Sequence, residues 1–74
     1  MVKITEVERR SLAAKKSIAE GDILVSINGN EIRDVLDYRF YLAEKKIDLK
    51  LSRNGEEYSV SIKKGEYDDI GLGF

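Results

Sequence analysis

The chain has 74 residues, a formal net charge of −1 from 13 basic and 14 acidic side chains, and no cysteine, histidine, proline or tryptophan. Its length suffices for one domain with a small core. Without cysteine there is no disulfide or thiolate zinc site, and without histidine the usual acid–base group near neutral pH is absent. With a net charge near zero, the chain does not produce the positive field that binding to a phosphate backbone requires. We therefore do not expect nucleic acid as a partner.

Nothing in the sequence suggests insertion into a membrane. The longest apolar run covers only residues 40–43, whereas a helix that crosses a bilayer needs roughly 20 residues. The N-terminus has no signal-peptide core. We therefore expect a cytoplasmic domain, and we also expect it to be monomeric.

The first half of the chain predicts a strand, a short helix and a second strand. Residues 2–7 are rich in β-branched types, but their apolar positions break strict alternation, which indicates a bulge or an early strand end. Ser11 is a suitable N-cap for a helix over residues 12–16. Ile23, Val25 and Ile27 then alternate with other residues as in a strand with one face on the core, and Asn28-Gly29 supplies a turn.

A longer helix is predicted over residues 34–46. Asp34, three residues before Asp37, forms a pattern similar to a capping box. Apolar residues cover more than one face of this helix, which fits either a core helix or a docking surface.

The sequence also predicts a hairpin centred on Asn54-Gly55, the dipeptide typical of a type I′ turn. This turn places four residue pairs opposite each other and all large apolar side chains on one face. The predicted pairs are Arg53 with Glu56, Leu51 with Tyr58, Leu49 with Val60, and Ile47 with Ile62.

The segment from Gly21 to Gly29 reads GDILVSING, follows the small-residue segment at Ser11–Ala14 and precedes the long helix. In this order and spacing, the elements resemble the central part of a PDZ domain. The resemblance implies an α+β fold: a small, partly open β-barrel or sandwich of about five strands with two helices.

The chain ends in Gly71-Leu72-Gly73-Phe74, which matches the carboxylate-binding loop of PDZ domains letter for letter. That loop usually comes near the start of the domain, so the resemblance implies circular permutation. The whole pattern, including DVLDYRFYL at residues 34–42, is similar to the N-terminal PDZ-like domain of a bacterial family of unknown function. In that family an iron–sulfur region resembling radical SAM enzymes follows. This implies that residues 1–74 are an excised N-terminal domain without a cofactor or metal of its own, and that any iron–sulfur cluster lies beyond Phe74.

The resemblance implies a non-catalytic module that binds an extended or C-terminal peptide by strand addition, or docks its own downstream domain. The loop residues Gly71, Leu72, Gly73 and Phe74 are expected to hold the peptide carboxylate, and Leu72 and Phe74 to line its side-chain pocket. The groove helix is expected to present Asp37, Tyr41 and Glu44. The strand against which a peptide pairs in the family follows this loop, so it is expected beyond Phe74.

Two alternatives remain open at this stage. The domain could be a structural cap for an iron–sulfur region, with no free peptide ligand. It could also be an enzyme, for which the best residues are a weak divalent-ion cluster or an acid–base group, although no residue is assigned a catalytic role. The cluster is Glu66, Asp68 and Asp69, and the acid–base group is Asp37, Tyr38 and Tyr41.

Overall fold

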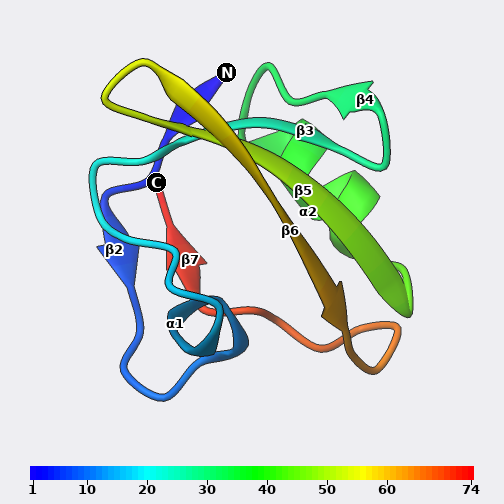
Figure 1. Cartoon of the computed structure of the whole chain (residues 1–74). Coiled ribbons are helices and arrows are strands. Elements are labelled where there is room, and N and C mark those ends of the chain that lie inside the picture. The colour runs from blue at the N-terminus through cyan, green and yellow to red at the C-terminus, as the bar shows by residue number, and fades with distance from the viewer.

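The computed structural model describes all 74 residues, which form two helices and seven strands in two antiparallel sheets (Figure 1). The larger sheet has the order β1-β3-β5-β6, with β4 paired to β3, and the smaller sheet pairs β2 with β7. The larger sheet is not closed into a barrel, and neither helix has the length and apolar character needed to cross a membrane. The predicted small α+β fold with two helices is confirmed. The elements are β1 (Val2–Lys3), β2 (Glu6–Val7), α1 (Leu12–Lys15), β3 (Ile23–Ile27), β4 (Asn30–Glu31), α2 (Val35–Leu42), β5 (Lys46–Arg53), β6 (Glu56–Lys63) and β7 (Leu72–Gly73).

The β5–β6 hairpin is the longest paired unit and runs across the whole molecule (Figure 1). Asn54 and Gly55 both have positive φ angles, of 53° and 83°, as a type I′ turn requires. All four predicted residue pairs are present in the observed register. Because this register gathers the apolar side chains on one face, the hairpin provides four buried core residues: Ile47, Leu49, Leu51 and Ile62.

The predicted first strand is divided between the two sheets. β1 pairs with β3 and β2 pairs with β7, so the strand does end early, as its sequence indicated. Ile4 lies between them, fully buried, and its N–H donates to the Asp22 carbonyl at 2.8 Å. The next residue, Thr5, donates its N–H to the Gly73 carbonyl at 2.9 Å. Two adjacent residues thus join the sheets.

The predicted strict alternation in β3 is wrong. The register with β5 shifts between Leu24 and Ser26, so Leu24 and Ile27 are the buried residues while Val25 is half-buried. A bulge adds one residue to a strand and therefore exchanges its faces beyond that point. The Asn28-Gly29 turn between β3 and β4 is present, with positive φ at both residues.

Both predicted helix starts are confirmed. Ser11 Oγ accepts the Ala14 N–H at 3.1 Å, and Asp34 Oδ1 accepts the Asp37 N–H at 2.9 Å. α1 ends at Lys15, one residue before the prediction.

The predicted end of α2 is wrong, because the helix stops at Leu42 rather than near residue 46. β5 begins at Lys46, and the Lys45 carbonyl already accepts the Lys64 N–H at 2.8 Å. The chain must therefore be extended before Ile47 can enter the core opposite Ile62. As a result, Glu44 lies beyond the helix.

A buried carboxylate links the start of β3 to the tip of the hairpin. Asp22 is 2% exposed and its carboxylate accepts bonds from Arg53 Nε at 2.9 Å and Arg53 Nη2 at 2.8 Å. It also accepts the Tyr58 hydroxyl and the Ala19 N–H, while Arg53 Nη2 reaches the Ser17 carbonyl at 2.8 Å. We refer to Asp22, Arg53 and Tyr58 as the Asp22 cluster.

The hydrogen bonds from Arg53 outweigh burial and lower the pKa of Asp22 to about 2. Burial and the hydrogen bond to Asp22 raise the pKa of Tyr58 to about 12. Asp22 is therefore charged and Tyr58 neutral at every physiological pH.

We predict that the Asp22 cluster produces a measurable acid limb in the stability of the domain. The folded pKa of Asp22 lies below its ordinary value of 3.8, so its contribution is complete above pH 4 and is lost as pH falls toward 2. This corresponds to about 2 kcal/mol of the free energy of unfolding at neutral pH. Urea unfolding of the native chain between pH 7 and pH 2 measures the total loss.

Asp22→Asn serves as the control because it removes the titrating group and leaves the other carboxylates in place. We expect this variant to be less stable at pH 7 and to converge with the native chain near pH 2. Parallel stability curves at all pH values would contradict the assignment.

Candidate functional site

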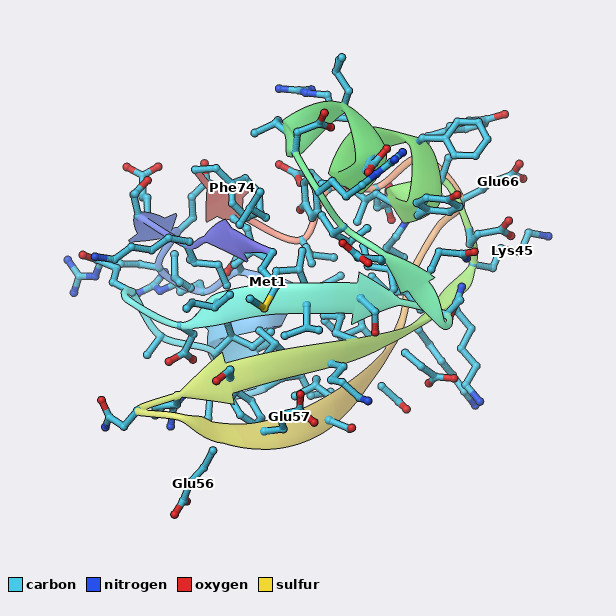
Figure 2. All side chains as sticks on the ribbon, turned by 90° about the horizontal axis from the view of Figure 1, so that it is seen from above. Met1, Lys45, Glu56, Glu57, Glu66 and Phe74 are labelled. Carbon is cyan, nitrogen blue, oxygen red and sulfur yellow. The ribbon has the colours of Figure 1, made fainter.

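A groove with a volume of about 390 Å³ lies between α2 and the C-terminal segment. One wall comes from α2, and the other comes from β7 and the residues around it. Figure 2 shows Phe74 between the α2 ribbon and the smaller sheet. The lining residues are Val35, Tyr38, Arg39, Leu42, Tyr67, Asp69, Leu72, Gly73 and Phe74.

The backbone of β7 has one edge in the small sheet and one edge toward the groove. The Gly71 and Gly73 carbonyls accept the Glu8 and Thr5 N–H groups, at 2.8 and 2.9 Å. Since successive residues of a strand direct their N–H and C=O groups to opposite sides, the polar backbone groups of Leu72 face away from β2. The groove therefore has a strand edge along one wall.

Gly71 sets the direction in which the chain enters this edge. It is buried with φ of +92°, a conformation that residues with a side chain rarely adopt. A Cβ atom at this position would lie 2.3 Å from Ser11 Cβ, at the N-cap of α1. The preceding Ile70 is fully buried and its carbonyl accepts the Ala13 N–H at 3.0 Å. α1 therefore anchors the segment that forms the groove wall.

The floor of the groove is aromatic. The Tyr38 and Phe74 rings meet edge to face, with centroids 4.7 Å apart. Tyr38 is 4% exposed, and its hydroxyl has no hydrogen-bond partner. Burial raises the pKa of Tyr38, and the negative charge of Asp69 raises it further. The groove therefore has an apolar floor that contains one unpaired hydroxyl.

The structure brings together only part of the predicted site. Leu72, Gly73 and Phe74 line the groove, and Gly71 forms the turn that leads into it.

The helix residues Asp37, Tyr41 and Glu44 do not line the groove. The Asp37 carboxylate accepts the Arg33 backbone N–H at 3.0 Å and Arg33 Nε at 3.1 Å, which ties it to the helix start. Tyr41 and Glu44 lie along a separate hollow on the other flank of the helix.

The helix residues that do line the groove share one face of α2. Val35, Tyr38, Arg39 and Leu42 follow the i, i+3, i+4, i+7 pattern of one side of a helix. The sequence alone does not single out this face, because apolar residues lie on more than one face of the helix. Only the position of β7 determines which face is used.

The two groups of residues considered for the enzyme alternative do not assemble. No group of three or more acidic side chains could hold a metal ion, and Asp68 and Asp69 accept backbone N–H groups from Gly65 and Ile70. Asp37, Tyr38 and Tyr41 point to three different surroundings: the helix start, the groove floor and the opposite flank.

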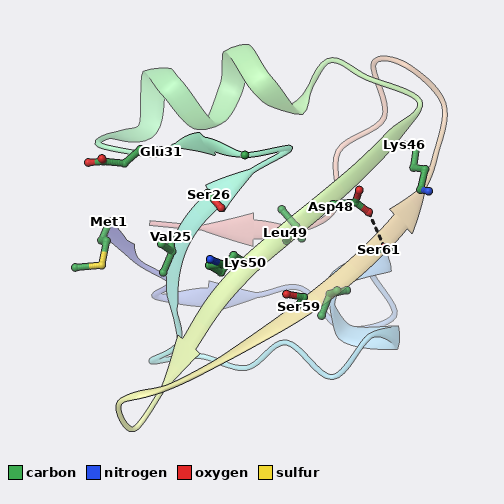
Figure 3. A pocket seen from close by; sticks show the side chains of 12 residues that line it. Met1, Val25, Ser26, Glu31, Lys46, Asp48, Leu49, Lys50, Ser59 and Ser61 are labelled. Carbon is green, nitrogen blue, oxygen red and sulfur yellow. Dashed lines mark hydrogen bonds between the residues drawn. The ribbon is translucent and has the colours of Figure 1, made fainter.

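A larger hollow of about 870 Å³ lies on the outer face of the main sheet (Figure 3). Serines and charged residues of β3, β5 and β6 make up half of its lining, and Asp48 accepts a hydrogen bond from Ser61 at 2.6 Å. None of its lining residues belongs to a helix, so it has no apolar helix wall. The groove beside α2 is therefore the better candidate for the binding site.

A scan against protein-family models matches residues 3–53 to the PDZ domain. This match covers more than half of the chain. The chain belongs to the PDZ family. The matched region includes the Asp22 cluster residues Asp22 and Arg53, α2 and the whole of β5, and ends before the Gly71–Phe74 loop.

This PDZ domain also matches curated proteins. It is 37% identical over 67 residues to a protein named "Serine protease HtrA-like" from two strains of Staphylococcus epidermidis. The alignment covers 84% of this chain but only 12% of each relative, so the chain spans a small part of their length.

A solved structure gives an independent comparison of the fold. The PDZ domain of the SdrC-like protein from Listeria monocytogenes superposes with a TM-score of 0.79 at 18% sequence identity. The match covers 96% of this chain and 83% of that chain. At this identity the likeness shows a shared fold.

We predict that Gly71→Ala destabilises this PDZ domain by about 2 to 4 kcal/mol, because it adds both a strained φ angle and a collision with Ser11. Gly29→Ala is the matched control. It has a similar φ of +81° but nothing within 4 Å of the added Cβ, so we expect a loss of about 1 kcal/mol. Urea unfolding of both variants measures the difference. Equal losses would show that the Ser11 contact has no energetic effect.

We predict that Tyr38→Phe raises the free energy of unfolding by about 1 kcal/mol, because it removes a buried hydroxyl that has no partner. The ring contact with Phe74 is retained in this variant. Thermal and urea unfolding measure the change. A loss of stability would mean that the hydroxyl has a bonding partner.

Proposed function

We propose that this PDZ domain binds an extended peptide segment in the groove between α2 and β7, as an added strand on the β7 edge. The observation that carries the proposal is the position of this edge directly across from an apolar helix wall. An extended peptide that adds to a sheet edge gains backbone hydrogen bonds, and every second side chain enters the groove beside it.

The lining supports an apolar ligand side chain. Val35 and Leu42 project from the helix, and Leu72 and Phe74 from the opposite wall. Burial of one aliphatic side chain in such a site is worth about 2 kcal/mol. We infer that at least one aliphatic or aromatic ligand residue points between these walls.

The loop residues Gly71, Leu72, Gly73 and Phe74 are proposed to hold the terminal carboxylate of the ligand through their backbone amides. Arg39 contributes a positive charge to the groove, whereas Asp69 contributes a negative one. The amides can attract a carboxylate that Asp69 repels. Comparing free-acid and amidated peptides separates these two effects.

We further propose that the domain is circularly permuted relative to the common PDZ order, because its glycine loop follows the β5–β6 hairpin instead of preceding the first strand. The resemblance to a bacterial family with an iron–sulfur region supports two alternatives. In the first, the ligand of this PDZ domain is a downstream segment of its own parent protein. In the second, the domain is a structural cap for the iron–sulfur region and has no free peptide ligand. Protease activity belongs to the relatives named as proteases, of which this chain matches only 12%.

We predict that Val35→Lys weakens peptide binding by about tenfold, because Val35 lines the groove and a charge would replace its apolar contact. The ligands are extended peptides ending in valine or phenylalanine, each as a free acid and as an amide. Titration of isotopically labelled protein followed by NMR measures binding.

Leu36→Lys is the matched control, since Leu36 is the next residue of the helix, is 76% exposed and does not line the groove. We expect it to bind like the native chain. If no peptide shifts the amide signals of Leu72 and Phe74, the proposed function is wrong. If shifts appear but amidation has no effect, strand addition stands without the carboxylate role of the loop.

A further inference from the structure

β6 has an open edge on the side of the larger sheet opposite β1 and β4. It pairs with β5 along all eight of its residues, Glu56 to Lys63, and no other strand pairs with it. A strand edge of this length carries unpaired backbone N–H and C=O groups that can pair with another chain. It is separate from β7, whose edge forms the proposed peptide groove.

The hairpin determines which backbone groups of β6 are free. The two-residue turn pairs Arg53 with Glu56, and the Lys64 N–H donates to the Lys45 carbonyl at 2.8 Å. Even-numbered residues therefore direct their polar backbone groups to β5, and odd-numbered residues direct theirs to the open edge. The outward residues are Glu57, Ser59, Ser61 and Lys63, all of them exposed.

The Lys63 end of this edge carries positive charge that has no acidic partner within one chain. Lys63 stands directly opposite Lys46 in the β5–β6 ladder, and no acidic side chain lies within ion-pair distance of Lys63. Like charges that face each other across strands are destabilising. Glu57, near the other end of the same edge, is 3.9 Å from Lys50 in a solvent-exposed pair. Figure 2 shows Glu56 and Glu57 on the side of the molecule opposite α2.

We propose that β6 pairs with β6 of a second copy of this chain, as antiparallel strands with Val60 at the two-fold axis. In this register Glu57 of each copy lies opposite Lys63 of the other, and Ser59 lies opposite Ser61. The outward backbone groups of all four residues then find partners. Each Lys63 gains a carboxylate where its own chain offers Lys46, so the edge is complementary to itself.

Other registers satisfy the edge less well. A shift that places Ser59 on the axis puts Glu57 opposite Ser61 and leaves Lys63 without a charge partner. A slip by one residue sets the outward backbone groups of one copy against residues of the other copy whose backbone groups face β5, so the hydrogen bonds between the strands cannot form. Only the Val60-centred register combines backbone pairing with both ion pairs.

The contact is a weak dimer. A single pair of short strands buries less surface than a stable interface requires, so association is concentration-dependent. Sedimentation equilibrium of the native chain from about 0.05 mM to about 1 mM covers the range expected for such an interface. We expect the weight-average mass to rise from 8.4 kDa toward twice that value.

Charge reversal tests the register. Lys63→Glu and Glu57→Lys each place like charges opposite each other in both halves of the dimer, and each is expected to weaken association by about tenfold. The double variant restores both ion pairs with their signs exchanged and is expected to recover the association of the native chain. Circular dichroism of each variant confirms folding, since both side chains are exposed.

The main competing contact is the exposed apolar pair Leu36 and Phe40 on α2, which are 76% and 74% exposed. Loss of association in Leu36→Lys would place the contact there and overturn the proposal. A constant mass of 8.4 kDa at all concentrations would also overturn it, as would charge reversals without effect. Peptide binding in the α2 groove tests the proposed function separately, because the groove residues lie outside β6.

Discussion

The bidentate pair between Asp22 and Arg53 is the contact on which the arrangement of the larger sheet depends. The two residues are 31 positions apart, and the pair joins the beginning of β3 to the tip of the β5–β6 hairpin. The almost complete burial of Asp22 makes its charge costly unless every oxygen has a donor. Arg53, Tyr58 and the Ala19 N–H supply those donors. A chain of this size buries little apolar surface, so one buried charge with all its hydrogen bonds makes up a large part of the total stability.

The Asp22 cluster is also connected, through the backbone around it, to the groove beside α2. The Asp22 carbonyl accepts the N–H of Ile4, and the next residue, Thr5, bonds to Gly73 in β7. Asp22, held in place by its side chain, is therefore linked through Ile4 and Thr5 to Gly73 in the groove wall. α1 holds that wall from the other side, through Ala13 and Ile70. The strand wall of the groove is thus held by hydrogen bonds to Thr5 and Ala13, whereas the other wall is formed by α2.

Local sequence signals predicted the parts of the fold whose causes are local. The Asn54-Gly55 turn and the alternation around it predicted the whole β5–β6 register, and Ser11 and Asp34 predicted both helix starts. The PDZ resemblance rested on the same kind of short-range pattern and agrees with the family match. These features need only a few neighbouring residues to form.

Features set by distant partners could not be predicted in this way. α2 ends at Leu42 because β5 must already be extended at Lys46, and the β3 bulge depends on pairing with β5. The groove residues depend on where β7 packs, so a largely apolar helix gave no signal that favoured Val35 and Leu42 over Tyr41. The sequence predicted that Arg53 flanks the hairpin turn and that Tyr58 lies in its second strand. Nothing in the sequence indicated that both contact Asp22.

We propose that an extended peptide pairs with the β7 edge beside α2. Amide hydrogen exchange of Leu72, measured with and without a saturating peptide, tests it most directly. We expect slower exchange of the Leu72 N–H in the complex, and little change at Gly73, whose backbone already faces β2. A bound peptide that leaves the exchange of Leu72 unchanged would contradict the claim.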